Sequence, residues 1–331
     1  TGYIGSHTAV ELINEGFEVV IIDNLSNSQA EVLDGIEKIT GKRPAFEKFD
    51  LCEAEKLNAF FRKYPGIEAI IHFAASKAVG ESVQKPLMYY RNNLNSLMNI
   101  LDGMKGSKTK NLIFSSSCTV YGQPDKLPVN ENAAIKKATS PYGNTKQIAE
   151  EIIQDTLNAT DGLKSIALRY FNPIGAHPSG HIGELPVGVP QNLVPFVTQT
   201  AIGIRQQLTV FGNDYNTPDG TCIRDYIHVV DLAKAHVVAV KRLLENKNKK
   251  RFEVFNLGTG KGVSVLEIIN TFEKACGVKL NFCFAPRREG DIEQIWADPA
   301  IANNELGWTA KSTLDETLLS AWKWEQTIRK K

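Results

Sequence analysis

Tyr142, Lys146 and a run of three serines are the residues whose types and spacing could carry out chemistry. Tyr142 and Lys146 are four residues apart, so on a helix both side chains project from one face toward the same point. Ser140-Pro141 predicts the start of such a helix, because proline is favoured at the first helical position. The serines, Ser115-Ser116-Ser117, follow an apolar strand-like run and would lie at the edge of a sheet where ligands bind.

This combination suits the removal of a hydride from a carbinol carbon. Such a reaction needs a base for the hydroxyl proton while a nicotinamide ring accepts the hydride. We predict Tyr142 as the base, with its pKa lowered from about 10 by the Lys146 ammonium and the positive ring. Ser117 is predicted to hydrogen-bond the same substrate oxygen, and Lys146 also to hold a ribose hydroxyl. The alternative is an exposed Tyr/Lys pair on a surface helix.

The first half of the chain alternates short apolar, β-branched runs with amphipathic stretches. This alternation predicts βαβ units and a parallel sheet that is buried on both faces. We therefore expect an α/β fold with a doubly wound parallel sheet (Rossmann). The expected strands are residues 18–23, 45–49, 69–74, 111–115 and 165–169.

From Phe171 onward the chain becomes rich in Gly/Pro loops, which predicts a change of domain near residue 172. We expect a dinucleotide-binding domain over residues 1–172 and a second, smaller α/β substrate domain over residues 173–331. The segment at about 224–257 contains a predicted helix and strand and is expected to return to the first sheet.

The N-terminal glycines indicate the cofactor. Gly2 and Gly5 have the spacing of the last two glycines of a dinucleotide-binding turn, and residues 6–14 continue as a helix whose amides could hold a pyrophosphate. Asp23 ends the next strand, where a carboxylate would bind ribose hydroxyls and repel a 2′-phosphate, which favours NAD over NADP. An ordinary turn residue is the alternative for Asp23. Because such a turn normally leaves a strand, we expect a strand ahead of Thr1 to be missing from this sequence.

Composition excludes several other classes. The net charge of +1 and pI of about 7.6 argue against nucleic-acid binding. The five cysteines contain no CxxC pair and indicate reduced thiols in a cytoplasmic protein. No apolar run approaches the roughly 20 residues that span a membrane. His177 and His181 lack carboxylate or thiol neighbours, so we expect no metal site. Cys118 is expected to be a buried filler, and His228 to stabilise a turn.

Several motifs together resemble the UDP-galactose 4-epimerases, which belong to the extended short-chain dehydrogenases. The motifs are TGYIGSH (1–7), SSSCTVYG (115–122), SPYGNTK (140–146), RYFNPIGA (169–176), FGNDY (211–215), RDYIHV (224–229) and APRREGD (285–291). The resemblance implies an isomerase that oxidises C4 of a UDP-hexose with tightly held NAD and returns the hydride to the opposite face. It also implies interconversion of UDP-galactose and UDP-glucose in galactose metabolism, by a cytoplasmic homodimer that pairs two helices per subunit.

The resemblance also implies which residues bind ligands. The implied cofactor residues are Gly2, Tyr3, Ile4, Gly5, Asp23, Asn24, Ser26, Asn27, Asp50, Leu51, Phe73, Ala74, Lys77, Asn92, Tyr142, Lys146 and Phe171. The implied substrate residues are Ser117, Tyr142, Asn172, Asn192, Leu193, Phe211, Arg224, Arg288 and Asp291. Arginine forks suit a diphosphate, and an aromatic ring with amide partners suits uracil.

Alternatives and departures from the family pattern remain. A nucleotide-sugar 4,6-dehydratase or decarboxylase is the nearest alternative, but dehydratases carry a carboxylate acid/base pair where this chain has Cys118-Thr119. A non-catalytic NAD-sensing regulator should have lost the tyrosine or lysine. Ile295 stands where glucose- and galactose-restricted epimerases commonly carry tyrosine, which would admit UDP-N-acetylhexosamines. The leading glycine of the family turn would fall ahead of Thr1.

Overall fold

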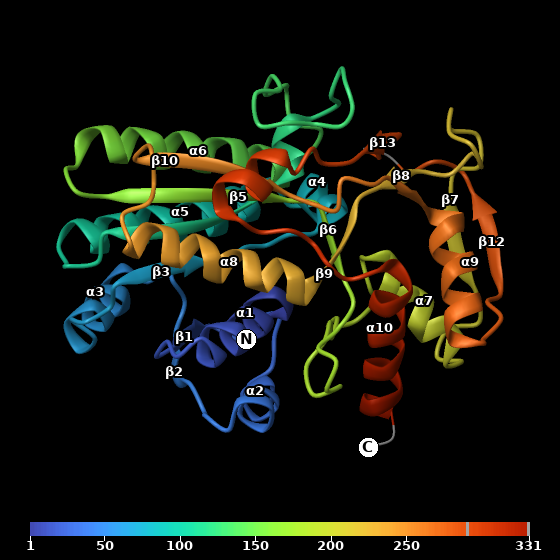
Figure 1. Ribbon diagram of the computed structural model, residues 1–331, viewed down its shortest axis with the longest axis horizontal. Helices are drawn as coiled ribbons and strands as arrows, with labels where there is room; N and C mark the ends of the chain where they lie inside the picture. Colours follow the sequence, from blue (N-terminus) through green and yellow to red (C-terminus); the bar gives the residue numbers. More distant parts are fainter. Residues whose placement is uncertain (289–290, 330–331) are drawn as a thin grey trace.

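A parallel sheet forms the centre of the molecule. The computed structural model describes residues 1–288 and 291–329. Four strands pair in the order β10-β5-β4-β3, all parallel (Figure 1). They are β3 (Ala69–His72), β4 (Asn111–Ser117), β5 (Lys164–Tyr170) and β10 (Phe252–Leu257). The expected doubly wound α/β fold with a parallel sheet is confirmed.

Helices cover both faces of this sheet because its central strands are apolar on both sides. Leu112 and Phe114 of β4 pack in one hydrophobic cluster, whereas Ile113 between them packs in another. The first cluster includes residues of α3 (Ala54–Lys63), α5 (Pro86–Lys105) and α6 (Pro141–Ala159), and the second includes α8 (Val229–Leu244), on the other face (Figure 1). Alternate side chains of one buried strand therefore serve two helical layers.

The N-terminal elements form a smaller parallel pair beside the central sheet. Among the described residues, β1 (Val20–Asp23) and β2 (Ala45–Lys48) form a two-stranded sheet of their own. Around them lie α1 (Tyr3–Asn14) and α2 (Val32–Thr40), while α4 (Val79–Gln84) precedes α5. A strand ahead of Thr1 stays a prediction.

The chain leaves the central sheet after β5 and later returns to it. β6 (Asn172–Ile174) pairs with β9 (Tyr226–His228), α8 follows, and β10 pairs in parallel with β5, with Leu257 opposite Tyr170. The predicted helix and strand of the returning segment are thus present. The division into two domains stays a prediction.

Six of the other elements of the described chain contribute to a separate hydrophobic cluster, at the right of Figure 1. They are α7 (Leu193–Ala201), β7 (Leu208–Phe211), β11 (Val263–Ser264), α9 (Val265–Cys276), β12 (Phe282–Ala285) and α10 (Leu314–Arg329). The short strands β8 (Ile223–Arg224) and β13 (Gln294–Ile295) are outside this cluster, and Ile295 packs with Cys118 and Phe171 instead. Two short elements lie apart from this cluster, η1 (Cys118–Tyr121) and η2 (Ala302–Leu306). β12 pairs in parallel with β7, and β13 pairs in parallel with β8.

Two boundaries near the predicted site differ from the sequence expectation. α1 begins at Tyr3 rather than at residue 6, because the Ser6 amide already donates to the Gly2 carbonyl at 2.9 Å. β4 continues through Ser117 rather than ending at Ser115, because its pairing with β5 runs on to Tyr170. Hydrophobicity marks the apolar part of a strand, whereas backbone pairing decides where the strand ends.

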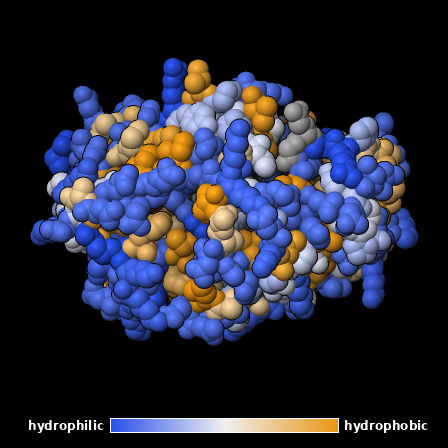
Figure 2. All heavy atoms as spheres, turned by 90° about the horizontal axis from the view of Figure 1, so that it is seen from above, coloured by the Kyte–Doolittle hydropathy of each residue, from blue (hydrophilic) through white to orange (hydrophobic). Residues whose placement is uncertain are grey.

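The surface is largely polar. Figure 2 shows hydrophilic side chains over most of the face in view, with hydrophobic side chains gathered in small groups. In the described part of the chain, no helix has the length and apolarity to cross a membrane. All five cysteines are free thiols, as the sequence indicated.

Candidate active site

The predicted Ser, Tyr and Lys residues come together at the carboxyl end of β4. Ser140 caps α6 by accepting from the Gly143 amide, so the helix begins as predicted. The Lys146 side chain is buried, and its Nζ donates to the Ser115 carbonyl at 2.7 Å. Nζ also lies 4.9 Å from the ring centroid of Phe114 and 5.9 Å from that of Tyr142. The alternative of an exposed surface pair is therefore wrong.

Ser117 is the last residue of β4 and lies beside Tyr142. Its Oγ accepts from the Thr119 amide at 3.2 Å and so caps η1. Because the oxygen serves as the acceptor of that bond, the hydroxyl proton can be donated to the Tyr142 oxygen, which lowers the pKa of Tyr142, or to a ligand that takes its place.

The pKa of Tyr142 in the protein alone is dominated by burial. Burial raises the pKa of this phenol well above its ordinary value, the neighbouring Tyr170 raises it further, and Ser117 offsets only part of the rise. Lys146 was expected to lower it, but its ammonium points to the Ser115 carbonyl. Burial also lowers the pKa of Lys146 to about 8, with Glu150 acting in the opposite direction. The protein alone thus keeps Tyr142 protonated.

Asp23 lies where the sequence placed a ribose-binding carboxylate, but in this chain it already has partners. Its Oδ2 accepts from the Thr1 hydroxyl at 2.8 Å. Its Oδ1 accepts from the Leu25 amide and from the Ser28 hydroxyl.

Other predicted cofactor residues line the ends of neighbouring strands. Asn24, after β1, donates to Asp50, after β2, at 2.9 Å. Gly5 lies against Phe73, which follows β3, because a Cβ on this glycine would stand 3.6 Å from the ring. Asn92 of α5 donates to Ser76 on the same loop as Phe73. Ser26, Asn27, Leu51 and Ala74 lie on these same three loops.

The remaining predicted cofactor residues lie beside elements of the second half. The Tyr3 hydroxyl donates to the Gly175 carbonyl at 2.6 Å, and Ile4 packs at the edge of the cluster around α8. Phe171 is buried, and its amide donates to the Leu257 carbonyl. Lys77 lies 3.7 Å from the Glu184 carboxylate.

Four predicted substrate residues from distant segments form one arginine cluster. Asp291 accepts from Arg288 at 3.2 and 2.8 Å and lies 4.0 Å from Arg224. The Arg288 guanidinium lies 5.9 Å from the ring centroid of Phe211, which is 43% exposed. Residues 289–290 of the predicted motif 285–291 lie outside the described residues. Two guanidinium groups and an accessible ring could together hold a nucleoside diphosphate.

The other predicted substrate residues contact neighbours of the residues already described. The Asn172 amide donates to the carbonyl of Asp225, next to Arg224, at 2.9 Å. Asn192 donates to Glu184, the residue that faces Lys77, at 2.5 Å. The neighbouring Leu193 begins α7 and packs at the edge of its hydrophobic cluster.

Sequence reasoning missed several residues that hold this arrangement. The Asn93 amide donates to the Ser76 carbonyl and to Thr145 on α6, which ties the loop after β3 to the Tyr142 helix. Glu150 pairs with Arg169 beneath the same helix. The spacing of Glu150, one turn beyond Lys146, was a signal that could have identified it.

Three residues weighed for other chemistry have ordinary roles. His228 Nδ1 accepts from the Val230 amide at 3.0 Å, which confirms its turn-stabilising role at the start of α8. Cys118 is buried, as expected, and burial raises the pKa of its thiol to about 12. His177 shares a hydrogen bond with Ser179. In residues 1–288 and 291–329 there is no group of three or more potential ligands arranged for a metal.

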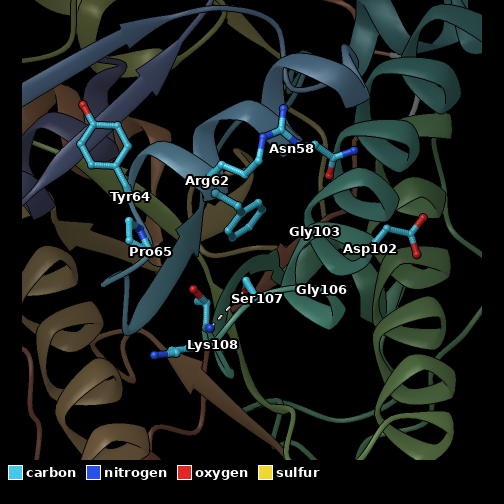
Figure 3. A pocket seen from close by; sticks show the side chains of 11 residues that line it. Asn58, Arg62, Tyr64, Pro65, Asp102, Gly103, Gly106, Ser107 and Lys108 are labelled. Atoms are coloured by element: carbon cyan, nitrogen blue, oxygen red, sulfur yellow. Dashed lines mark hydrogen bonds between the residues drawn. The ribbon is translucent and has the colours of Figure 1, made fainter.

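A pocket of about 490 Å³ lies elsewhere on the molecule (Figure 3). It is lined by the ends of α3 and α5 and by residues that lead into β4, including Arg62, Asp102 and Lys108. This is the opposite end of β4 from Ser117. None of its 11 lining residues is a predicted site residue.

Comparisons with known proteins agree on one kind of relative. The family model described as GDP-mannose 4,6 dehydratase matches residues 1–320. A UDP-glucose 4-epimerase of Bacillus subtilis (strain 168) is 51% identical over 98% of this chain and 95% of that protein. A UDP-glucose 4-epimerase of Homo sapiens is 48% identical over 98% of this chain and 94% of that protein.

Solved structures give the same result. A UDP-glucose-4-epimerase from Stenotrophomonas maltophila, with bound NAD and formylated UDP-arabinopyranose, has a TM-score of 0.95 and 44% identity, covering 99% of this chain and 96% of that one. A UDP-glucose 4-epimerase from Bifidobacterium longum, in complex with NAD+ and UDP, has a TM-score of 0.94 and 45% identity, covering 98% and 96%.

Proposed function

This chain belongs to the family of the UDP-glucose 4-epimerases, and from that premise we propose that it is an isomerase that interconverts UDP-galactose and UDP-glucose with bound NAD. The observation that carries the proposal is the position of the half-buried Tyr142 and the buried Lys146 beside Ser117 at the carboxyl end of β4. The arginine cluster, in which the Arg288 side chain is 53% exposed and that of Arg224 15%, supports a nucleotide-linked substrate.

Tyr142 is the proposed acid/base group for the C4 hydroxyl. It takes the hydroxyl proton as C4 is oxidised and gives it back when C4 is reduced from the other face. NAD, when bound, supplies the hydride acceptor and the hydride donor in turn, so the cycle has no net redox change. Because burial keeps Tyr142 protonated in the protein alone, positive charge next to the phenol is what would favour its deprotonation.

Lys146 and Ser117 support this proton transfer. Lys146 contributes a cation that Ser115 holds in place, and Ser117 offers its free hydroxyl proton to the substrate oxygen. Gly2 to Gly5, Asp23 and the loops after β1, β2 and β3 are the proposed NAD site. The start of α1 presents backbone amides there, which suit a pyrophosphate.

The arginine cluster is the proposed site for UDP. Arg224 and Arg288 would bind the diphosphate, with Asp291 orienting them and Phe211 stacking on uracil. Strong binding of the UDP half would allow the hexose to turn over between the two hydride transfers. We also propose the division into an NAD domain (1–172 with about 224–257) and a UDP-sugar domain formed by the rest of the chain.

Cys118-Thr119 disfavours a dehydratase on this scaffold. A dehydratase needs a second acid/base pair after the strand serine, and a buried thiol whose pKa is raised to about 12 does not exchange protons near neutral pH. The curated relatives named above are epimerases as well.

A cytoplasmic homodimer is part of the proposal. The five free thiols suit a reducing compartment. Val83 and Leu87, at the end of α4 and the start of α5, are 56% and 66% exposed, which suits contact with a second copy along the α5 and α6 helices. Sedimentation of the wild type and of Leu87→Glu would test this, because the charge should shift the protein toward monomer.

The deciding experiment is incubation of the protein and NAD with UDP-galactose and no added reductant. UDP-glucose should accumulate to equilibrium, whereas a 4-keto-6-deoxy product would indicate a dehydratase. A parallel reaction with UDP-N-acetylgalactosamine tests the prediction at Ile295, which is buried beside Cys118 and Phe171. If UDP-N-acetylgalactosamine is not converted, the prediction that Ile295 broadens the specificity is wrong.

A further inference from the structure

Glu150 and Arg169 form a buried ion pair beneath the Tyr142 helix. The two residues are 8% and 6% exposed. Arg169 Nε donates to Glu150 Oε1 at 2.9 Å, and a second guanidinium nitrogen donates to Oε2. Ser116 Oγ donates to the same carboxylate at 2.5 Å. One carboxylate on α6 is therefore bound at once by β5 and by β4.

The network continues from Arg169 to the segment that follows Ser117. Arg169 Nη1 donates to the Tyr121 hydroxyl at 3.0 Å, and that hydroxyl donates to Asn256 at 2.7 Å. Tyr121 ends η1, the short helix that Ser117 begins. Arg169 thus links Glu150 on α6 to Tyr121 at the end of η1, the short helix that Ser117 caps.

Stability alone is a poor explanation for this pair. The desolvation of two buried charges offsets most of their attraction, so such pairs contribute little net stability and more often specify geometry. Glu150 is one helical turn beyond Lys146 on α6, on the same face. It is therefore well placed to fix the position of Lys146.

We propose that Glu150 is a positioning residue, which with Arg169 and Ser116 fixes α6 against the ends of β4 and β5 and so keeps Lys146 on the Ser115 carbonyl and Tyr142 beside Ser117. The proposal rests on the proposed function for its kinetic test. It adds a role for a residue that would touch neither substrate nor cofactor.

The groups around Lys146 make this role measurable. Tyr142 and Glu150 lie on its own helix, His72 on β3, and Tyr170 on β5 with its hydroxyl on Ser115. Burial and Lys146 itself lower the pKa of His72 to about 3, so His72 carries no charge near neutral pH. Glu150 is the charge that raises the pKa of Lys146 against burial. Loss of the Glu150 charge should therefore lower the pKa of Lys146 further.

The chain offers a matched control in a second buried pair. Arg242 of α8 donates to Glu253 of β10 at 2.7 and 2.9 Å, and both residues are 8% exposed. The two pairs have the same residue types, the same two-bond geometry and similar burial. Arg242 and Glu253 belong to α8 and β10 and contact none of the proposed catalytic residues.

The experiment compares Glu150→Gln with Glu253→Gln in the full chain. Both should lower the melting temperature, because each removes the carboxylate that binds a buried arginine through two hydrogen bonds; Arg242 keeps only the weaker contact with Glu305 at 3.8 Å. Glu150→Gln alone should reduce kcat by about tenfold or more with little change in KM, and should move the alkaline limb of kcat to lower pH by on the order of one unit. A Lys146 titration followed by NMR of 13Cε-labelled lysine should show the same shift.

The outcomes separate this proposal from the proposed function. If the wild type does not convert UDP-galactose, the proposed function is wrong, while the NMR titration still tests the influence of Glu150 on Lys146. The positioning role would be overturned if Glu150→Gln kept the alkaline limb of kcat and the Lys146 titration of the wild type. It would also be overturned if Glu253→Gln shifted both by the same amount. If Glu150→Gln does not fold, Ser116→Ala removes one hydrogen bond to Glu150 without an unpaired charge. It should lower kcat in the same direction, and an unchanged kcat would count against the proposal.

Discussion

Lys146 and Arg288 are both cations of the candidate site, yet one is buried and the other lies in solvent. Lys146 is 5% exposed, and burial lowers its pKa to about 8. The Arg288 side chain is 53% exposed and shares Asp291 with Arg224. Burial thus shifts the pKa values of Tyr142 and Lys146, which lie beside Ser117. The arginine cluster instead presents a permanent positive charge that a ligand can reach at Arg288.

This difference follows from the two kinds of chemistry. A group that exchanges a proton needs a pKa that its surroundings can shift, and burial shifts it strongly. A group that binds a diphosphate needs a permanent charge that a ligand can reach, and a guanidinium stays protonated at any physiological pH.

Tyr142→Phe should give the largest loss. Removal of the proposed acid/base group should lower kcat by about 10²- to 10⁴-fold, while bound NAD, measured by absorbance after release, stays near the wild-type amount. The ring keeps its place beside Ser117, so thermal stability should change little. Loss of NAD together with activity would instead point to a structural role for Tyr142.

Arg288→Leu should weaken substrate binding rather than proton transfer. The loss of charge-assisted hydrogen bonds to a diphosphate, worth about 1.5–3 kcal/mol, should raise KM for UDP-galactose by roughly 10- to 100-fold at nearly constant kcat. Arg287→Leu is the matched control, because Arg287 pairs with Asp214 and lies over Tyr215. Equal effects of the two variants would contradict a specific role for Arg288.

The alkaline limb of kcat should report Lys146. As pH rises through about 8, Lys146 loses its proton, and the cation beside Tyr142 is lost. Turnover should then fall by about tenfold for each further pH unit. Lys146→Arg, whose charge does not titrate, should show lower activity without this limb. A limb that persists in Lys146→Arg would have to come from another group.

Added salt should affect the arginine cluster and spare the residues around Lys146. Charges in solvent are screened over about 10 Å at 0.1 M salt, so KM for UDP-galactose should rise by roughly a few-fold between 0.05 and 0.5 M. The value of kcat should stay nearly constant, because buried charges such as Lys146 are screened much less than exposed ones. A fall in kcat at constant KM would instead indicate that the site around Lys146 is more exposed to salt than the arginine cluster.

The positions of the strands could be predicted from the sequence, but the pairing between strands could not. The five expected strands of the first half are present within a few residues, because buried parallel strands are short apolar runs that local reading can find. The pairing that carries β4 through Ser117 is set by Tyr170, more than 50 residues later, and no local pattern contains it.

The residues of the site were predictable, but their electrostatics were not. Their identities came from motifs, and the structure brings Ser117, Tyr142 and Lys146 together as expected. Burial raises the pKa of Tyr142 in the protein alone, an effect that depends on packing, whereas the predicted effect of a bound nicotinamide ring stays a prediction. Glu150 escaped notice because its partners, Arg169 and Ser116, lie on two other elements.

Because β10 returns to pair with β5, we expect that the first 172 residues would not fold on their own. A fragment that ended there would expose the outer row of β5 amides and carbonyls, which β10 covers from Phe252 to Leu257. An uncovered apolar strand of this length is a template for aggregation. Limited proteolysis in the exposed loop around residue 188 should therefore give two pieces that remain associated until a denaturant separates them.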